Sequence, residues 1–188
     1  MIKRLLASIC ILAPQNTNTL SMDTDVQKST IFKEIEADLK QKGLEIHNQD
    51  QTRPWGGFFV INESQAQKFA DTYFEGIPVE DLKISGKLSP KILVVAPDKR
   101  LSWQYHHRRA EIWKVLRGNV GVVTSLNDEE GKLEVLKPGD LIKLEQGQRH
   151  RLIGTSNWAV LAEIWQHTDK ENPSDEEDII RVQDDFGR

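Results

Sequence analysis

The sequence predicts an all-β protein, a barrel or double-sheet roll that follows a helical N-terminal arm. From Lys91 onward, short runs of β-branched and aromatic residues alternate with turn-forming residues. About eight such runs follow one another at intervals of roughly eight to twelve residues, a spacing typical of antiparallel sandwiches and barrels. No amphipathic helix separates these runs, so the sequence does not predict a parallel sheet.

The first 21 residues precede the predicted fold and are expected to contribute nothing to it. Lys3 and Arg4 are followed by an uncharged run, residues 5–13. This run has the length of a signal-peptide core and is too short to cross a membrane. The alternative is a start codon assigned too early, with the chain beginning at Met22. We expect a cytoplasmic protein, or an exported one if residues 1–21 are a signal peptide.

Residues 22–52 form the predicted N-terminal arm. We expect a helix over residues 29–42, followed by Gly43 at the position of a left-handed helix stop. The helix is predicted from apolar residues that recur every four positions on one face: Ile31, Ile35 and Leu39. A polar stretch over residues 47–52 then connects the arm to the β domain.

The β domain is expected to occupy residues 53–188. Its first strand-like run is residues 58–61, followed by a helix at 64–74 and a loop at 76–90. The predicted strands after the loop are 91–95, 101–106, 111–116, 120–126, 133–136, 141–145, 149–154 and 158–166. The segment after Asn172 is first acidic and then apolar, which predicts a strap that packs on the domain.

Composition excludes several classes of function. The 25 basic and 29 acidic residues give a net charge of −4, which argues against a nucleic-acid partner. No apolar run approaches the ~20 residues of a membrane-spanning helix, so no membrane partner is expected. Cys10, the single cysteine, cannot form an internal disulfide or a cysteine metal site.

Four residues predict a metal site: Gln104, His106, Glu111 and His150. Side chains alternate faces along a strand, so Gln104 and His106 point the same way. Glu111 opens the next strand, and His150 opens a later strand after a turn. Two imidazoles, a carboxylate and an amide oxygen suit a divalent first-row metal. A single histidine on an apolar strand is more often a satisfied core or surface residue than a ligand.

The setting of these residues narrows the interpretation. They resemble the two-part signature of the cupin barrels, with Gln104 where many cupins have their first histidine. Asp98 and Glu145 depart from the glycine and proline that usually occupy those turn positions. The parts that carry the resemblance are the turn at 97–100, Q-x-H-x4-E at 104–111, Pro-Gly-Asp at 138–140 and G-x-x-H at 147–150.

A narrower resemblance covers residues 53–188. The type II phosphomannose isomerases closely resemble this chain in the strings RPWGGF from 53, LSWQYHHRRAEIW from 101, KPGD from 137, GQRHRL from 147 and EDIIRVQDDFGR from 177. The resemblance implies a cupin double-stranded β-helix, or jelly-roll barrel, with residues 62–90 as an insertion. It also implies one divalent metal ion, zinc first, with Co²⁺, Mn²⁺, Ni²⁺ or Fe²⁺ as alternatives, and a homodimer.

By this resemblance, the protein is an aldose–ketose isomerase that interconverts mannose 6-phosphate and fructose 6-phosphate or a related sugar phosphate. Two alternatives stay open. One is a non-catalytic cupin that binds a sugar or sugar phosphate. The other is a cupin oxidative enzyme, against which Gln104 argues, because such enzymes usually hold iron with more histidines.

The resemblance also suggests roles for three basic residues. Arg181 is the candidate phosphate anchor and catalytic residue, although it could instead pair with Asp178 or Asp184. Lys91 is a candidate substrate-contacting and catalytic lysine that could serve as the proton shuttle, or else a solvated strand end. Arg109 could lean over the metal and bind substrate, or could equally form a solvated corner with Arg108. Alternation turns His107, Arg149 and Arg151 away from the pocket, and the face of Glu163 is not determined by the sequence.

Overall fold

The structure, a computed structural model, describes the backbone of residues 17–75 and 77–187 and side chains from Asp25 onward. The predictions for residues 1–21 therefore lie outside the described range, except that residues 17–21 begin the first helix. The elements in chain order are α1 (Thr17–Gln41), β1 (Ile46–Asp50), β2 (Gly56–Ile61), η1 (Glu63–Gln65), α2 (Ala66–Tyr73), α3 (Val79–Leu82), β3 (Lys91–Val95), β4 (Trp103–His106), β5 (Arg109–Arg117), β6 (Val120–Ser125), β7 (Leu133–Leu136), β8 (Leu141–Leu144), β9 (Arg149–Gly154), β10 (Ala159–His167), η2 (Glu176–Asp178) and β11 (Ile179–Gln183).

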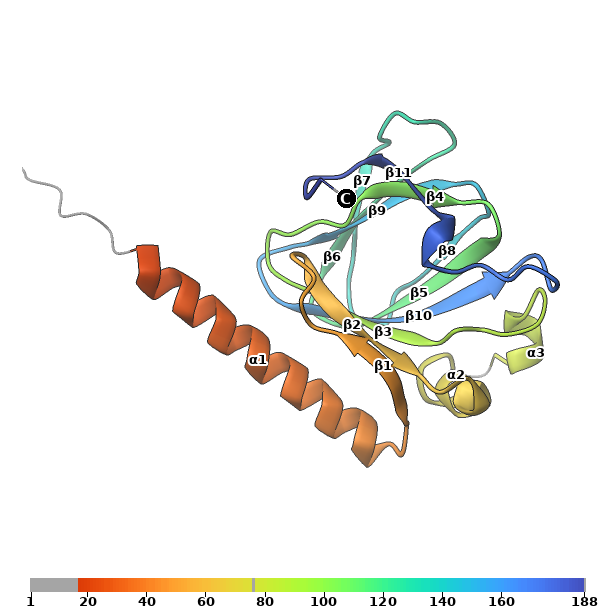
Figure 1. The fold of residues 1–188 in the computed structure, drawn as a ribbon, viewed down its shortest axis with the longest axis horizontal. Helices are drawn as coiled ribbons and strands as arrows, with labels where there is room; N and C mark the ends of the chain where they lie inside the picture. Colours follow the sequence, from red (N-terminus) through yellow and green to blue (C-terminus); the bar gives the residue numbers. More distant parts are fainter. Residues whose placement is uncertain (1–16, 76, 188) are drawn as a thin grey trace, which may run out of the picture.

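The strands form two sheets, and the predicted all-β class is confirmed. The larger sheet has the order β1-β2-β3-β10-β5-β8, and the smaller has the order β11-β4-β9-β6-β7. Every pairing between these strands is antiparallel. All eight strands predicted after the loop are present, with ends that shift by a few residues. The two sheets face each other in a jelly roll (Figure 1).

Three predicted boundaries were wrong. Residues 46–50, which overlap the expected polar connection at 47–52, form the edge strand β1. This strand lacks an apolar alternation because most of its residues are exposed. Helix α1 begins at Thr17 and not at residue 29, since a helix can continue beyond the part whose apolar face is buried. The expected loop at 76–90 contains the single-turn helix α3.

The three central strands of the larger sheet are buried on both faces. In β3, for example, Leu93 and Val95 pack inside the barrel, whereas Ile92 and Val94 pack on its outer side. Because successive side chains of a strand point to opposite faces, one short run contributes to two separate cores. This arrangement explains why β3 is apolar without alternation.

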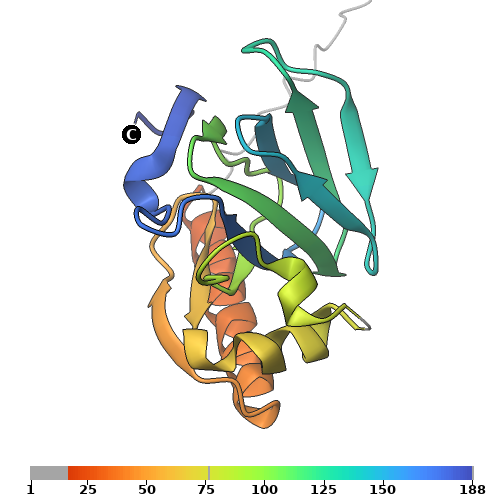
Figure 2. The same cartoon turned by 90° about the vertical axis from the view of Figure 1, so that its right-hand side faces the viewer.

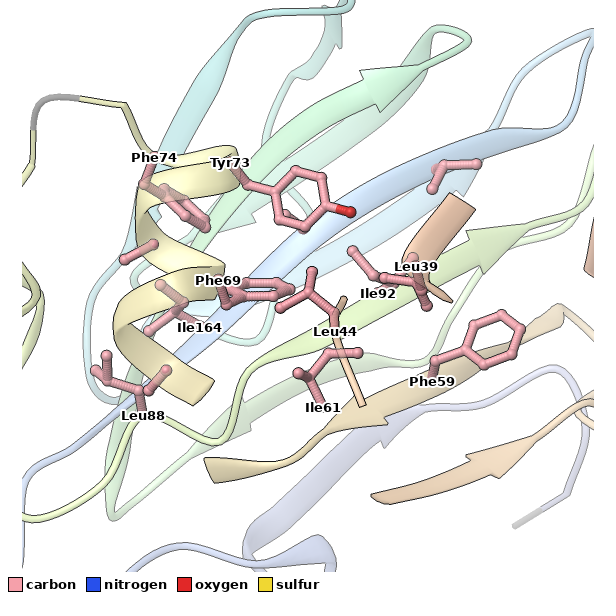
Figure 3. Close-up of a cluster of buried hydrophobic side chains, with 14 of the residues drawn as sticks. Leu39, Leu44, Phe59, Ile61, Phe69, Tyr73, Phe74, Leu88, Ile92 and Ile164 are labelled. Atoms are coloured by element: carbon pink, nitrogen blue, oxygen red, sulfur yellow. The ribbon is translucent and has the colours of Figure 1, made fainter. Parts of the chain in front are cut away.

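Helices cover the outer face of this sheet. The second half of α1 contributes a buried stripe that includes Phe32 and Leu39, and α2 contributes Phe69 and Tyr73. Figure 3 shows Leu39 of α1 and Phe69 of α2 lying over the strands, close to Ile92 and Ile164. Figures 1 and 2 show the three helices gathered on this side of the molecule, away from β7. No helix in the described ranges is long and apolar enough to cross a membrane.

The inside of the barrel changes from apolar to polar along its strands. On β10, Ala159 and Leu161 belong to the inner apolar cluster, whereas Glu163, two residues further, lines a polar cavity. On β5, Val115 is part of the same apolar cluster, and Glu111 lines the cavity. One end of the barrel is therefore a packed core, and the other end holds the ionisable side chains.

The segment between β2 and β3 is fastened to the polar end. The Glu63 carboxylate accepts the backbone N–H groups of Leu88 and Ser89 at 2.7 and 2.8 Å. The Ser89 hydroxyl lies 2.9 Å from Nε2 of His167, at the end of β10. Burial lowers the pKa of His167 to about 4, so the imidazole is neutral at neutral pH. These contacts hold the end of β10 in position.

We predict that Leu39→Ala lowers the free energy of unfolding by about 2–5 kcal/mol, because the Leu39 side chain is fully buried between α1 and the sheet. Glu36→Ala, on the exposed side of the same helix, is the control. Denaturant unfolding of both variants measures the difference. An equal effect of the two substitutions would show that α1 is not part of the cooperative core.

Candidate metal centre

Three strands bring the candidate ligands together at the polar end of the barrel. His106 lies on β4, Glu111 on β5 and His150 on β9. All three side chains point inward, and each residue is 2% exposed. Gln104 also points inward and is paired directly with His150 between β4 and β9. Neighbouring strands of the smaller sheet thus present three candidate ligands, and Glu111 faces them from the larger sheet.

The ligand atoms of His106, Glu111 and His150 all lie within 4.8 Å of one another. Nε2 of His106 is 3.1 Å from Oε1 of Glu111 and 3.3 Å from Nε2 of His150. Nε2 of His150 is 3.5 Å from Oε2 of Glu111. The three residues thus form a compact N,N,O donor set.

The hydrogen bonds of the two imidazoles favour a metal between them. Nδ1 of His106 is 3.2 Å from the backbone oxygen of Asp178, and Nδ1 of His150 is 3.0 Å from that of Gln148. Since carbonyl oxygens only accept, both Nδ1 atoms carry the proton, and both Nε2 atoms present lone pairs. The two Nε2 atoms lie 3.3 Å apart, so both lone pairs can be directed at one cation. Metal-binding histidines are oriented by this type of Nδ1 contact.

The charge states also fit a metal. Burial alone raises the pKa of Glu111, but the Arg109 guanidinium opposes burial, and the pKa lies well below its usual range. Burial lowers the pKa of His150 to about 4 despite the nearby Glu111 carboxylate. At neutral pH, the site therefore offers a carboxylate and a neutral imidazole, the protonation states that bind metal.

Gln104 has a different partner in this structure. Its Oε1 accepts a hydrogen bond of 2.6 Å from the Ser102 hydroxyl. A carbonyl oxygen has two lone pairs, so this contact leaves one for a metal. The structure groups His106, Glu111 and His150, and the role of Gln104 as a fourth ligand remains a prediction.

Arg109 lies over the donor set. Its Nε donates to Oε1 of Glu111 at 2.7 Å, and Nη2 lies 3.1 Å from Nε2 of His106. Its Nη1 donates to the Ser174 hydroxyl at 2.8 Å. The guanidinium also stacks 3.6 Å from the ring centre of Trp165. The structure thus brings Arg109 next to the predicted ligands.

Lys91 is buried and faces the same cavity. Its Nζ donates to Oε1 of Glu176 at 3.0 Å and lies 3.2 Å from the ring centre of Trp165. Burial lowers the pKa of Lys91, although Glu163 and Glu176 oppose that effect. The interpretation of Lys91 as a solvated strand end was wrong, because its side chain is buried against Trp165 and bonded to Glu176 of the strap.

The cavity itself measures about 60 Å³. Arg181 lines it from β11, where it pairs with Gln104 of β4. Four of the described side chains that line it are cationic: Arg53, Lys91, Arg109 and Arg181. Arg53 belongs to the RPWGGF string, yet sequence reasoning gave it no role. An Arg–Pro pair before a strand gave no indication that the side chain turns inward.

The strap fixes the metal centre through Asp178, a residue that sequence reasoning considered only as a possible partner of Arg181. Its carboxylate accepts the backbone N–H groups of His107 and Arg108 at 3.1 and 3.0 Å. Its backbone oxygen accepts a hydrogen bond from Nδ1 of His106. One residue therefore holds both the turn after β4 and the orientation of a ligand. Asp178 is one of four consecutive acidic residues, and the sequence does not distinguish it from the others.

Other expectations were confirmed. His107 is exposed, and Arg149 and Arg151 pair with Asp128 and Glu130 outside the barrel. Asp98 adopts a left-handed backbone conformation with φ of 56°. Aspartate is among the few side chains that tolerate it, so Asp98 can stand where the cupin signature has glycine.

Comparison with solved structures identifies the fold class. A variant of oxalate decarboxylase from Bacillus subtilis superposes with a TM-score of 0.51 at 15% identity, over 73% of this chain and 30% of that chain. A cupin 2 conserved barrel domain protein from Salinispora arenicola is 25% identical over 42% of this chain and 62% of its own, with a TM-score of 0.37. KdgF from Halomonas sp. has 12% identity and a TM-score of 0.46 over 66% of this chain and 91% of that chain. The chain thus covers less than two thirds of the length of the oxalate decarboxylase and of the Salinispora arenicola protein. The protein is a cupin jelly roll.

Sequence comparison gives the family. Residues 78–184, more than half of the chain, match the family described as mannose-6-phosphate isomerase C-terminal. The chain belongs to this family, as the resemblance predicted. A search of curated proteins found no match. The match begins at residue 78, inside the segment 62–90 that is predicted to be an insertion.

We predict that His106→Ala lowers the metal content of the purified protein, because the substitution removes one of the two imidazole donors. His107→Ala, which changes the adjacent exposed histidine, should leave it unchanged. Elemental analysis after loading with Zn²⁺ measures both. A full metal equivalent in His106→Ala would contradict the ligand assignment.

Proposed function

We propose that this protein is a metal-dependent aldose–ketose isomerase that interconverts mannose 6-phosphate and fructose 6-phosphate. The observation that carries the proposal is the meeting of a His-His-Glu donor set with four cationic side chains around one cavity. A sugar phosphate requires both features, a site that polarises its carbonyl group and positive charge for its phosphate. Membership of the isomerase family supports the same chemistry.

The reaction moves a proton between C2 and C1 of the open-chain sugar through an enediol. His106, Glu111 and His150, with Gln104, would hold the metal ion, preferably Zn²⁺, which when bound supplies Lewis-acid polarisation of the reacting oxygens. The low exposure of these ligands keeps bulk water from the reacting atoms. That exclusion strengthens each electrostatic interaction within the cavity.

The cationic residues provide the remaining binding energy. A guanidinium can donate two parallel hydrogen bonds to a phosphate, so Arg181 is the proposed anchor. Arg109 would bind the sugar next to the metal. Lys91 would place its positive charge near the oxygens that become negative as the enediol forms. A fixed charge at such a position stabilises the transition state of the reaction.

Substrate binding also requires motion. The cavity of about 60 Å³ has room for only a few water molecules, whereas pockets for small ligands are several times larger. Arg109 and Lys91 are tied to the strap through Ser174 and Glu176. We therefore expect the strap to move outward when a sugar phosphate binds.

The decisive experiment is conversion of mannose 6-phosphate to fructose 6-phosphate by purified protein. We expect turnover to disappear after chelation and to return when Zn²⁺, Co²⁺ or Mn²⁺ is added. Protein that is folded and metal-loaded, binds hexose phosphates and yet converts none of them would instead be the non-catalytic sugar-binding cupin.

We predict that Arg181→Ala weakens binding of the phosphorylated sugar by about 10- to 100-fold, the value of a hydrogen bond to a charged group. Arg117→Ala, which removes an exposed arginine paired with Glu34 on the outer face, is the control. Titration calorimetry with mannose 6-phosphate and mannose measures the effect. Equal losses for the two sugars would exclude the anchor role.

A further inference from the structure

Glu163 is an inward-facing acid on β10 whose orientation the sequence left open. It is 5% exposed and lines the cavity. Trp113 Nε1 donates to its Oε1 at 3.0 Å. Glu163 is also the direct cross-strand partner of Lys91. This buried carboxylate has no part in the metal cluster or in the phosphate anchor.

The three acids of the cavity differ in their partners. Glu111 is ion-paired with Arg109 at 2.7 Å, and Glu176 is ion-paired with Lys91 at 3.0 Å. In the described part of the chain, Glu163 has the hydrogen bond from Trp113 and no ion pair. Among these three described acids, Glu163 is therefore the one whose carboxylate is not neutralised by an ion pair.

We propose that Glu163 is the catalytic acid–base group that carries the proton between C2 and C1 of the sugar. This assignment rests on the isomerase activity proposed above. Lys91 keeps its role as a fixed positive charge. Its ammonium is already bonded to Glu176, so it is less suited to accept a proton from carbon.

The groups that face Glu163 set its acidity. Burial raises the pKa of Glu163 to about 7, and the negative charge of Glu111 acts in the same direction, whereas Lys91 and Arg109 oppose the shift. A carboxyl group with a pKa near the working pH can both take up and release a proton efficiently. The geometry and the acidity of Glu163 therefore agree.

The proposed proton transfer conserves atoms and electrons. Oε2 of Glu163 takes the proton from C2, the C–H electron pair becomes the C1=C2 bond, and the carbonyl electron pair moves to O1. The hydroxyl proton of O2 passes to O1. The electron pair on O2 then re-forms a carbonyl at C2, while the C1=C2 pair takes the proton from Glu163 at C1. No oxidant or reductant is needed.

The test is Glu163→Gln, which removes the ionisable oxygen but keeps an acceptor for Trp113. We expect kcat for mannose 6-phosphate to fall by about 100- to 10,000-fold. Metal content and affinity for mannitol 6-phosphate, which has no carbonyl and cannot react, should be retained. Glu134→Gln, on the exposed edge strand β7, is the control and should keep full activity.

Two results would overturn the assignment while leaving the isomerase proposal intact. One is a Glu163→Gln variant that still isomerises near the wild-type rate. The other is a variant that loses turnover together with its metal, which would make Glu163 a structural support. Wild-type protein that isomerises no sugar phosphate would instead remove the proposed function itself.

A second measurement does not depend on the folding of a variant. A hexitol 6-phosphate with an epoxide across C1 and C2 forms an ester with a carboxylate that reaches these carbons. After incubation with the wild-type protein, peptide mass spectrometry should locate the ester on Glu163. An ester on Glu176 or Glu111 would assign the proton transfer to that residue and overturn the proposal.

Discussion

The two-sided burial of the central strands is the constraint on which the rest of the structure depends. β3, β5 and β10 each contribute alternate residues to the helix-covered core and to the barrel interior. Their outward residues fix the sheet against the helices, so their inward residues have little freedom of position. Glu111 and Glu163 are therefore held by a rigid sheet, whereas flexible loops would place them less precisely.

Burial has an electrostatic consequence as well. A charge inside the barrel must be compensated, because an isolated buried ion is very costly. Arg109 with Glu111 and Lys91 with Glu176 meet this requirement, and the Trp165 ring lies against both cations. The same pairs tie the cavity to the strap. Moving the strap away from the barrel would separate Lys91 from Glu176 and would leave a buried charge uncompensated.

The sequence predicted the β strands because turn residues separate them clearly, and it predicted the candidate ligands because their alternation and motif are local. It could not predict β1, which is polar because it is an exposed edge. It could not place Glu163 either. Strand β10 is buried on both faces, so the residues around Glu163 are apolar on both sides of the strand and do not show which face points into the barrel. The role of Asp178 depends on contacts with residues about 70 positions away, which no local pattern encodes.

The outer core has a consequence for the boundaries of the domain. The family match starts at residue 78, but more than half of the buried residues in the outer cluster precede it, including Leu39, Phe59 and Phe69. A fragment trimmed to the matched range would expose Ile92 and Ile164 to water on the face opposite the candidate metal centre. The range that matches the family is thus shorter than the range that shares one hydrophobic core, and a stable domain requires the longer range.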